Sequence, residues 1–238
     1  IGVPFDLQKQ LHNNHENLFL CENVASEPGS HSISANEIAF AAEKIAAASR
    51  PIIIAGLGVV NAGAKEACIK LAEQSGALLA TTLPAKGLFH DQPFCLGVAG
   101  GYASDKAKAI FAKSDLVIGI GARLASHSFE GGQLTPNAFV VHLDVAPQTY
   151  VQGRHAADLL IKADAKYGAN ALSAVLDRKT GWRTPTMQQV TSDALVLPDD
   201  RITPDGLLHP MAVIRQLADI IPATCHVVNT SGHCAYYT

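Results

Sequence analysis

Short, continuously apolar runs alternate with amphipathic segments along most of the chain. The apolar runs are typical of buried strands, and they occupy 51–55, 77–82, 116–120, 139–143 and 159–162. The segments between them have helical spacing, which predicts helices over 34–49, 64–75, 104–113 and 165–176. A strand that is apolar at every position is buried on both faces. The pattern therefore predicts an α/β fold: a doubly wound, mostly parallel sheet with helices on both faces, as in Rossmann-like domains.

Local signals at helix ends support this interpretation. Ser34 and Glu37 have the spacing of a capping box, which predicts the start of the first helix. Gly76 follows the second helix and is expected to cap its C-terminus in the left-handed conformation. Residues 96–101 are rich in glycine and are predicted to be a loop.

The same pattern divides the chain into four parts. Residues 1–30 mix polar, proline and glycine signals and are predicted to be a remnant of a preceding domain with a connector; 31–178 form the central Rossmann-like domain. Residues 179–208 contain prolines and little periodicity, which predicts a linker. Residues 209–238 begin a second, partial α/β unit, with a helix over 211–221 and a strand over 225–228. The chain starts inside one apparent strand and stops just past another, so we expect a piece of a larger protein.

Composition excludes several classes of function. The 238 residues carry a net charge of -3, which gives no electrostatic case for nucleic acid or an anionic membrane. No apolar run approaches the length of a membrane span. The five cysteines are scattered and never spaced as C-x-x-C, so neither a disulfide framework nor a metal site is expected, and a cytoplasmic location fits best.

The residues that could bind a ligand follow the ends of the predicted parallel strands. Ligands of such sheets bind at that edge. Gly56-Leu57-Gly58 forms a tight turn before a helix, and its backbone amides are expected to be free for an anion such as phosphate. Arg123 could fork onto a phosphate and Asp144 could accept from a ribose hydroxyl. Glycines also end strands in any doubly wound sheet, so a nucleotide site and a purely structural role stay open here.

Other enzyme classes lack their motifs. The NAD pattern G-x-G-x-x-G would need a glycine at Asn61, and no acidic residue ends the second strand. There is no Walker motif or G-x-S-x-G, and Asp205-Gly206 and Ser231-Gly232-His233 are more simply turns. We therefore assign no catalytic residue.

Taken in order, several phrases resemble the central domain of thiamine-diphosphate-dependent enzymes of the acetolactate-synthase type. They are RPIIIAGLGVVNAGAKEACIKLAEQSGALLATTLPAKGLFHDQPFCLG, SDLVIGIGARL and FVVHLDVAPQTY. VPFDLQ is similar to the end of that family's pyrimidine-binding domain, and LLHPMAVIRQLADIIPATCHVVNTSGH to the start of its diphosphate-binding domain. The resemblance covers nearly the whole chain.

The resemblance implies a fragment of a decarboxylase or carboligase (a lyase or transferase) that acts on a 2-oxo acid. Family enzymes use a glutamate of the pyrimidine domain, and a G-D-G motif with a later asparagine that holds Mg²⁺ on the thiamine diphosphate. This sequence contains no G-D-G. The resemblance thus implies a chain that is inactive alone, whose partners are the missing flanking domains, within a parent enzyme that is a homo-oligomer.

In family members with FAD, the central domain binds the flavin. The positions that match are Gly56, Gly58, Thr82, Leu83, Gly97, Gly121, Arg123 and Asp144. The sequence departs from the FAD pattern at Gly101-Tyr102-Ala103, at Leu124-Ala125-Ser126-His127 and at Ala146. The sequence is therefore compatible with bound FAD, with bound ADP, or with no nucleotide at all. Two alternatives to the fragment hypothesis are a stand-alone nucleotide-binding or interaction module, and another enzyme of similar fold, such as a sirtuin-like deacylase or an electron-transfer flavoprotein subunit.

Overall fold

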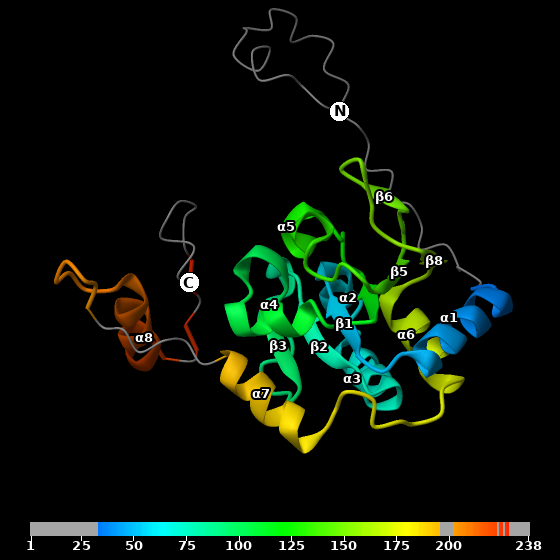
Figure 1. Ribbon diagram of the computed structural model, residues 1–238, viewed down its shortest axis with the longest axis horizontal. Coiled ribbons are helices and arrows are strands. Elements are labelled where there is room, and N and C mark those ends of the chain that lie inside the picture. Colours follow the sequence, from blue (N-terminus) through cyan, green and yellow to red (C-terminus); the bar gives the residue numbers. More distant parts are fainter. Residues whose placement is uncertain (1–32, 196–201, 223, 226, 229–238) are drawn as a thin grey trace, which may run out of the picture. The chain divides into compact units, whose positions relative to one another are not determined.

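The structure is a computed structural model that describes residues 33–195, 202–222, 224–225 and 227–228 (Figure 1). The predicted remnant over 1–30 and the Ser231-Gly232-His233 turn lie outside the described residues.

Six parallel strands form one sheet in the order β3-β2-β1-β4-β5-β8. Their bounds are β1 Pro51–Ala55, β2 Leu78–Thr81, β3 Cys95–Val98, β4 Leu116–Ile120, β5 Phe139–Asp144 and β8 Leu159–Lys162. The predicted doubly wound parallel sheet is therefore confirmed. Its strand β3 was missed, because Gly97 inside a four-residue strand resembles a loop in the sequence.

The direction of strand addition reverses beside β1, which is the position where such folds place their ligands. Ile54 of β1 lies opposite Ala80 of β2 on one side and opposite Gly119 of β4 on the other. The loops that follow β1 and β4 therefore leave the same edge of the sheet next to each other.

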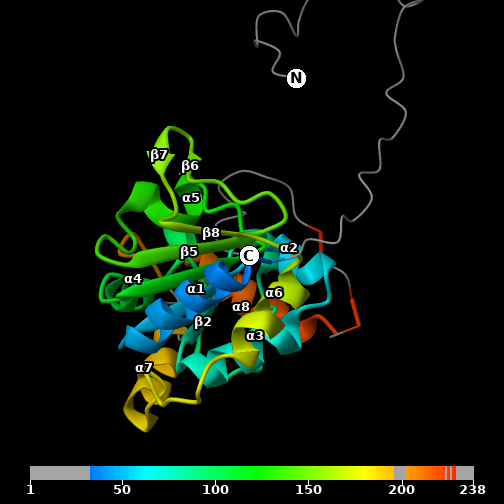
Figure 2. The same cartoon turned by 90° about the vertical axis from the view of Figure 1, so that its right-hand side faces the viewer.

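Helices cover both faces of the sheet, as Figures 1 and 2 show. The helices α1 (Ala35–Ala47), α3 (Lys65–Ser75) and α6 (Ala165–Ala174) share one buried apolar cluster with Ile53 and Ile118. The helices α4 (Asp105–Phe111) and α7 (Pro185–Leu195) contribute to a second cluster with Ile52 and Ile54. Alternate residues of β1 thus enter opposite cores, and all five of its residues are buried. This two-sided burial explains why the strands are apolar throughout.

Shorter elements connect these layers, mostly at the strand ends. They are α2 (Leu57–Asn61), the 3-10 turns η3 (Leu83–Ala85), η4 (Gly100–Tyr102) and η5 (Glu130–Gly132), α5 (Ser126–Phe129), and the two-stranded hairpin β6 (Tyr150–Val151) and β7 (Arg154–His155). The predicted helix near the C-terminus is α8 (Pro210–Ile220), which begins with His209 Nδ1 accepting from the Met211 amide at 3.1 Å. Residues 225, 227 and 228 are not in a strand, contrary to the predicted strand over 225–228.

Two further expectations need correction. The Ser34 side chain makes no capping hydrogen bond, so the capping box does not form, although the helix starts where expected. The segment predicted as a linker contains α7, which packs on β3 and α4. Ser104 Oγ donates to the Ala194 carbonyl at 2.7 Å, and Thr191 Oγ1 donates to the Pro93 carbonyl at 2.9 Å. Gly76 does cap α3 in the left-handed conformation, as predicted.

The described helices include none that is both long and apolar enough to cross a membrane. Cys68, Cys95 and Cys225 carry free thiols, and the first two are buried.

Candidate functional site

The glycine turn after β1 is packed against the loop after β4. Gly56 N donates to the Ile120 carbonyl and Gly58 N donates to the Gly121 carbonyl, both at 2.9 Å. A Cβ on Gly56 would lie 2.1 Å from the Gly121 oxygen, and one on Gly58 would lie 2.7 Å from the Gly121 Cα. These glycines are therefore required by the close approach of two loops. The expectation that their amides are free for an anion is wrong.

A short helix follows this turn in place of a long one. The helix α2 has five residues, ends at Asn61, and is separated from α3 by Gly63 at φ 55°. The sequence did not reveal α2, because five residues are too few for a helical period to show. Since the dipole of so short a helix is small, α2 adds little to anion binding at the turn.

The ends of β2 and β3 bring the next three predicted residues to the same edge. Thr82 is buried, and its amide donates to the Ala55 carbonyl at 2.8 Å. Leu83 is 44% exposed and offers an apolar surface there. Gly97 has φ 75°, and its amide donates to Cys95 Sγ at 3.3 Å.

The ends of β4 and β5 supply the predicted residues whose polar groups can reach a ligand. Gly121 has φ 54°, and its amide donates to the Leu143 carbonyl at 2.8 Å. Arg123 is exposed two residues later. Asp144 is half-buried, and its Oδ1 accepts from the Ala146 amide at 3.0 Å; among the described residues no donor reaches its other carboxylate oxygen. The side chains of Arg123 and Asp144 thus remain usable at this edge.

Two buried polar groups near these strands lie outside the eight predicted positions. His142 on β5 is 2% exposed, and its Nδ1 accepts from the Gln148 amide at 3.2 Å. Its Nε2 is buried, and among the described residues it has no hydrogen-bond partner. Thr81 Oγ1, at the end of β2, is also buried without one. The sequence did contain one indication of a buried polar group, a histidine within the apolar run FVVHLD.

Leu124 occupies space beside the end of β4. It is 3% exposed and has φ 50°, a conformation that costs a non-glycine residue of order 1 kcal/mol. Its Cδ2 lies 2.6 Å from the point where Gly119 would carry a Cβ. Gly119 pairs with His142 in the sheet, so the Leu124 side chain fills room that a larger residue on β4 would take.

A diphosphate does not fit the turn after β1 in the way the sequence suggested. The amides of Gly56 and Gly58 are already bonded to the main chain, and only Arg123 and Asp144 offer polar side-chain atoms among the eight predicted residues that reach solvent. A nucleotide at this edge would therefore depend on side chains and not on a glycine cradle.

The Asp205-Gly206 pair lies in a hydrogen-bonded turn. The Thr203 hydroxyl donates to the Asp205 carboxylate, and this hydrogen bond lowers the pKa of that carboxyl from its ordinary value. Gly206 has φ 82°, and its amide donates to the Thr203 carbonyl at 2.8 Å. The interpretation of this pair as a turn is confirmed. Within the described ranges, no group of three or more His, Cys, Asp or Glu side chains could hold a metal ion.

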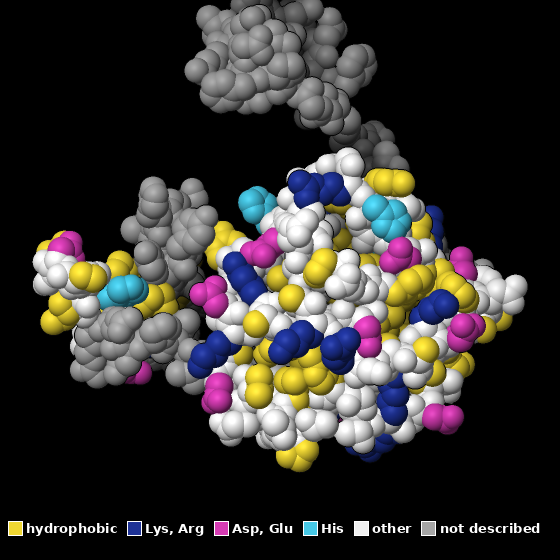
Figure 3. Space-filling model, viewed as in Figure 1, with side chains coloured by type: hydrophobic (Ala, Val, Ile, Leu, Met, Phe, Trp, Pro, Cys, Tyr) yellow, Lys and Arg dark blue, Asp and Glu magenta, His cyan; other side chains and the backbone are white. Residues whose placement is uncertain are grey.

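The surface does not gather one sign of charge on the face shown in Figure 3. Basic and acidic side chains are interspersed there with apolar ones. This distribution agrees with the small net charge of -3.

Comparison with known proteins shows which family the domain with the parallel sheet belongs to. The family described as "Thiamine pyrophosphate enzyme, central domain" matches residues 38–175, which is more than half of the chain and includes all six strands. The chain belongs to the thiamine-pyrophosphate-dependent enzyme family. Within that family it is similar to acetolactate synthases, as the resemblance predicted.

Three relatives illustrate the similarity. A probable acetolactate synthase large subunit of Methanocaldococcus jannaschii is 35% identical over 142 residues, which are 59% of this chain and 24% of that protein. An acetolactate synthase of Mycobacterium leprae is 31% identical over 208 residues, 83% of this chain and 33% of that protein. A probable 2-ketoarginine decarboxylase of Pseudomonas aeruginosa is 29% identical over 220 residues, 90% of this chain and 37% of that protein. The chain thus spans between 24% and 37% of the length of these three relatives.

Proposed function

We propose that this chain supplies the supporting central domain of a thiamine-diphosphate-dependent decarboxylase or carboligase that acts on a 2-oxo acid. The observation that carries the proposal is the family match over 38–175, which coincides with the parallel sheet and its covering helices. The names of the relatives, acetolactate synthase and 2-ketoarginine decarboxylase, both support a 2-oxo-acid substrate.

Thiamine diphosphate supplies the carbanion-stabilising chemistry in such enzymes, and the protein must position it. The sequence contains no G-D-G, and the described residues include no group of three or more His, Cys, Asp or Glu side chains that could hold the accompanying metal ion. We therefore assign the cofactor, with Mg²⁺, to flanking domains of the parent enzyme, and give this chain the role of a scaffold. The flanking domains and further copies of the enzyme are its proposed partners, and the cytoplasm its proposed location.

Cofactor binding and turnover test this proposal. The 238-residue chain is mixed with thiamine diphosphate, Mg²⁺ and pyruvate, with a complete acetolactate synthase as the positive control. We expect neither calorimetric binding of thiamine diphosphate nor consumption of pyruvate. Turnover by the chain would overturn the proposal, because it would place a complete active site within these residues.

A second proposal concerns FAD or ADP at the edge formed by the eight predicted residues. It is supported by the exposed Arg123, which can recognise a phosphate, and by Asp144, whose second carboxylate oxygen accepts no hydrogen bond from the described residues and can accept one from a ribose hydroxyl. Such a nucleotide would be held by these side chains.

Titration with ADP tests the second proposal. We expect Arg123→Gln to weaken binding about tenfold, since a charge-assisted hydrogen bond is lost. Lys166→Gln is the matched control, because Lys166 is an exposed cation in the first turn of α6. Equal losses in both variants, or an absence of ADP binding by the unmodified chain, would remove the proposal.

A further inference from the structure

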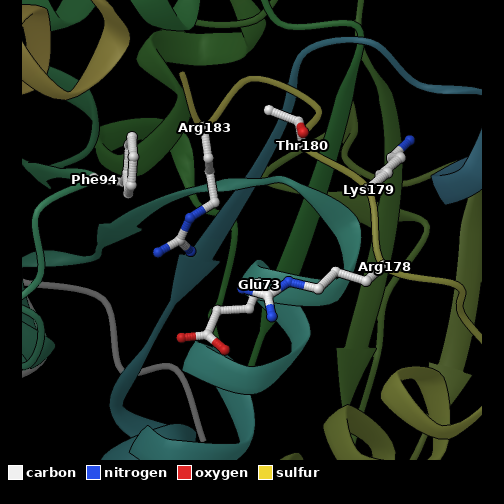
Figure 4. A pocket seen from close by; sticks show the side chains of 6 residues that line it. All are labelled: Glu73, Phe94, Arg178, Lys179, Thr180 and Arg183. Atoms are coloured by element: carbon white, nitrogen blue, oxygen red, sulfur yellow. The ribbon is translucent and has the colours of Figure 1, made fainter. Parts of the chain in front are cut away.

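A hollow of about 450 Å³ opens at the edge of the sheet where the strands begin, opposite the candidate nucleotide site. Its lining comes from the last turns of α3, the residue before β3, and the loop 177–184 after α6 (Figure 4). The lining residues are Glu73, Phe94, Arg178, Lys179, Thr180 and Arg183.

The loop 177–184 is fixed in place by main-chain contacts. Trp182 N donates to the Gly76 carbonyl at 2.9 Å, and Lys179 N donates to the Gln74 carbonyl at 3.0 Å. Gly76 and Gly181 meet so closely that a Cβ on Gly76 would lie 2.5 Å from the Gly181 Cα. These contacts hold the backbone of the loop 177–184, so the Cα atoms of Arg178 and Arg183 have fixed positions beside the hollow.

Arg183 forms one wall of the hollow. Its guanidinium lies over the Phe94 ring, 4.5 Å from the ring centre (Figure 4). Its Nη1 donates to the Ala77 carbonyl at 3.5 Å, which is at the limit of a hydrogen bond. A guanidinium has five N–H donors, so most of its hydrogen-bonding capacity remains for a ligand or water.

Arg178 brings a second guanidinium to the same space. Burial lowers the pKa of Arg183, Glu73 opposes that shift, and the nearby positive charge of Arg178 adds to it. Glu73 lines the same hollow (Figure 4), yet among the described residues no ion pair joins Glu73 to either arginine. The two positive charges therefore face each other with only partial compensation.

Lys179 has a different role, although it lines the same hollow. Its ammonium donates to the carbonyls of Ile45, Ala46 and Ala48 at the end of α1. In Figure 4 its side chain points away from the two arginines. Lys179 thus closes the C-terminus of α1 and leaves the hollow to Arg178 and Arg183.

We propose that this hollow binds a small dianion, of the phosphate or dicarboxylate kind, between Arg178 and Arg183. Two guanidinium forks match the paired oxygens of such groups, and the partly buried position of Arg183 strengthens the hydrogen bonds it makes. A structural alternative is that both arginines only complement the negative end of the α3 dipole. The alternative predicts no saturable response to a dianion.

The single tryptophan of the chain reports on this site, because Trp182 is the neighbour of Arg183. Its fluorescence is recorded while the full chain is titrated with inorganic phosphate and, separately, with succinate, each against sodium chloride of equal ionic strength. We expect saturable binding of at least one dianion beyond the chloride response. Saturation by phosphate alone identifies the phosphate kind, and saturation by succinate alone the dicarboxylate kind. A response equal to that of chloride for both would overturn the proposal.

Substitutions then locate the binding. Arg178→Gln is expected to weaken the dianion about tenfold, and Glu73→Gln to tighten it about threefold by removing a repelling charge. Both residues are exposed, so the fold should be preserved, which far-ultraviolet circular dichroism checks. Lys166→Gln is the control at the far edge and is expected to leave the affinity unchanged. Equal weakening by Arg178→Gln and Lys166→Gln would contradict a defined site.

Discussion

Three glycines at the ends of β1 and β4 lie so close together that none of them has room for a side chain. Gly56 and Gly58 touch Gly121 through main-chain atoms, and each would meet a backbone atom within 3 Å if it carried a Cβ. The sequence showed that a turn follows β1, but not that its amides are bonded. The partner carbonyls lie on β4 and its loop, more than 60 residues away, and no local pattern records that contact.

Gly56→Ala tests this requirement. The added methyl would lie 2.1 Å from the Gly121 oxygen, and the backbone cannot move away without breaking two hydrogen bonds. We expect a loss of about 2–3 kcal/mol in the free energy of unfolding, measured with urea. Gly101→Ala is the matched control, since nothing lies within 4 Å of its added methyl, and it should change stability by less than about 0.5 kcal/mol. Equal effects would refute the close-packing explanation.

A buried thiol should make the fold sensitive to alkali. Burial raises the pKa of Cys68 from 9.0 to about 12. Below pH 9 the Cys68 thiol is protonated in the folded and in the unfolded chain, so its ionisation does not lower the stability there. Between these values the unfolded chain loses the proton and the folded chain keeps it, so stability falls by up to about 1.4 kcal/mol per pH unit.

Urea unfolding at about pH 8 and about pH 10 measures this fall. The Cys68→Ala variant should lose less stability between the two pH values, because it has no thiol to ionise. An identical fall in both proteins would show that other groups cause it.

At the scale of elements, the long strands and helices were predictable and their junctions were not. The periodic runs of 51–55 and 116–120 became β1 and β4 as expected. Two of the missed elements are stabilised by other elements of the fold: β3 pairs with β2, and α7 packs on β3 and α4. Of the candidate site, the sequence placed the eight residues at strand ends, yet it could not show which polar atoms stay free.

The capping of α1 by a distant lysine is a second junction of this kind. Lys179→Met removes the ammonium that donates to three carbonyls at the end of α1 and keeps most of the side-chain volume. We expect a loss of about 1–2 kcal/mol in urea unfolding. Lys166→Met, at an exposed position in α6, should lose less than about 0.5 kcal/mol. Similar losses for the two variants would mean that the capping contributes nothing.

At the scale of the whole molecule, α7 packs on β3 and α4 within the segment that the sequence pattern predicted to be a linker. The side chains of Thr191 and Ala194 are buried in the contact of α7 with the sheet layer. A boundary after residue 195 therefore fits the described packing better than one after residue 178.

Truncation distinguishes the two boundaries. A chain that ends at Thr184 lacks α7 and should lose at least about 3 kcal/mol of stability, because apolar side chains of the second core become exposed. A chain that ends at Leu195 should keep the stability of the central domain. Equal stability of the two truncated chains in urea would restore the linker interpretation of 179–195.

The strand order β3-β2-β1-β4-β5-β8 also has a consequence for synthesis on the ribosome. The first strand made is central, the next two extend the sheet in one direction, and the last three extend it in the other, each in the order of translation. Every new strand thus meets a partner that has already emerged, and none has to be inserted between two paired strands. The nascent sheet can grow outward from residue 51 without rearranging what has formed.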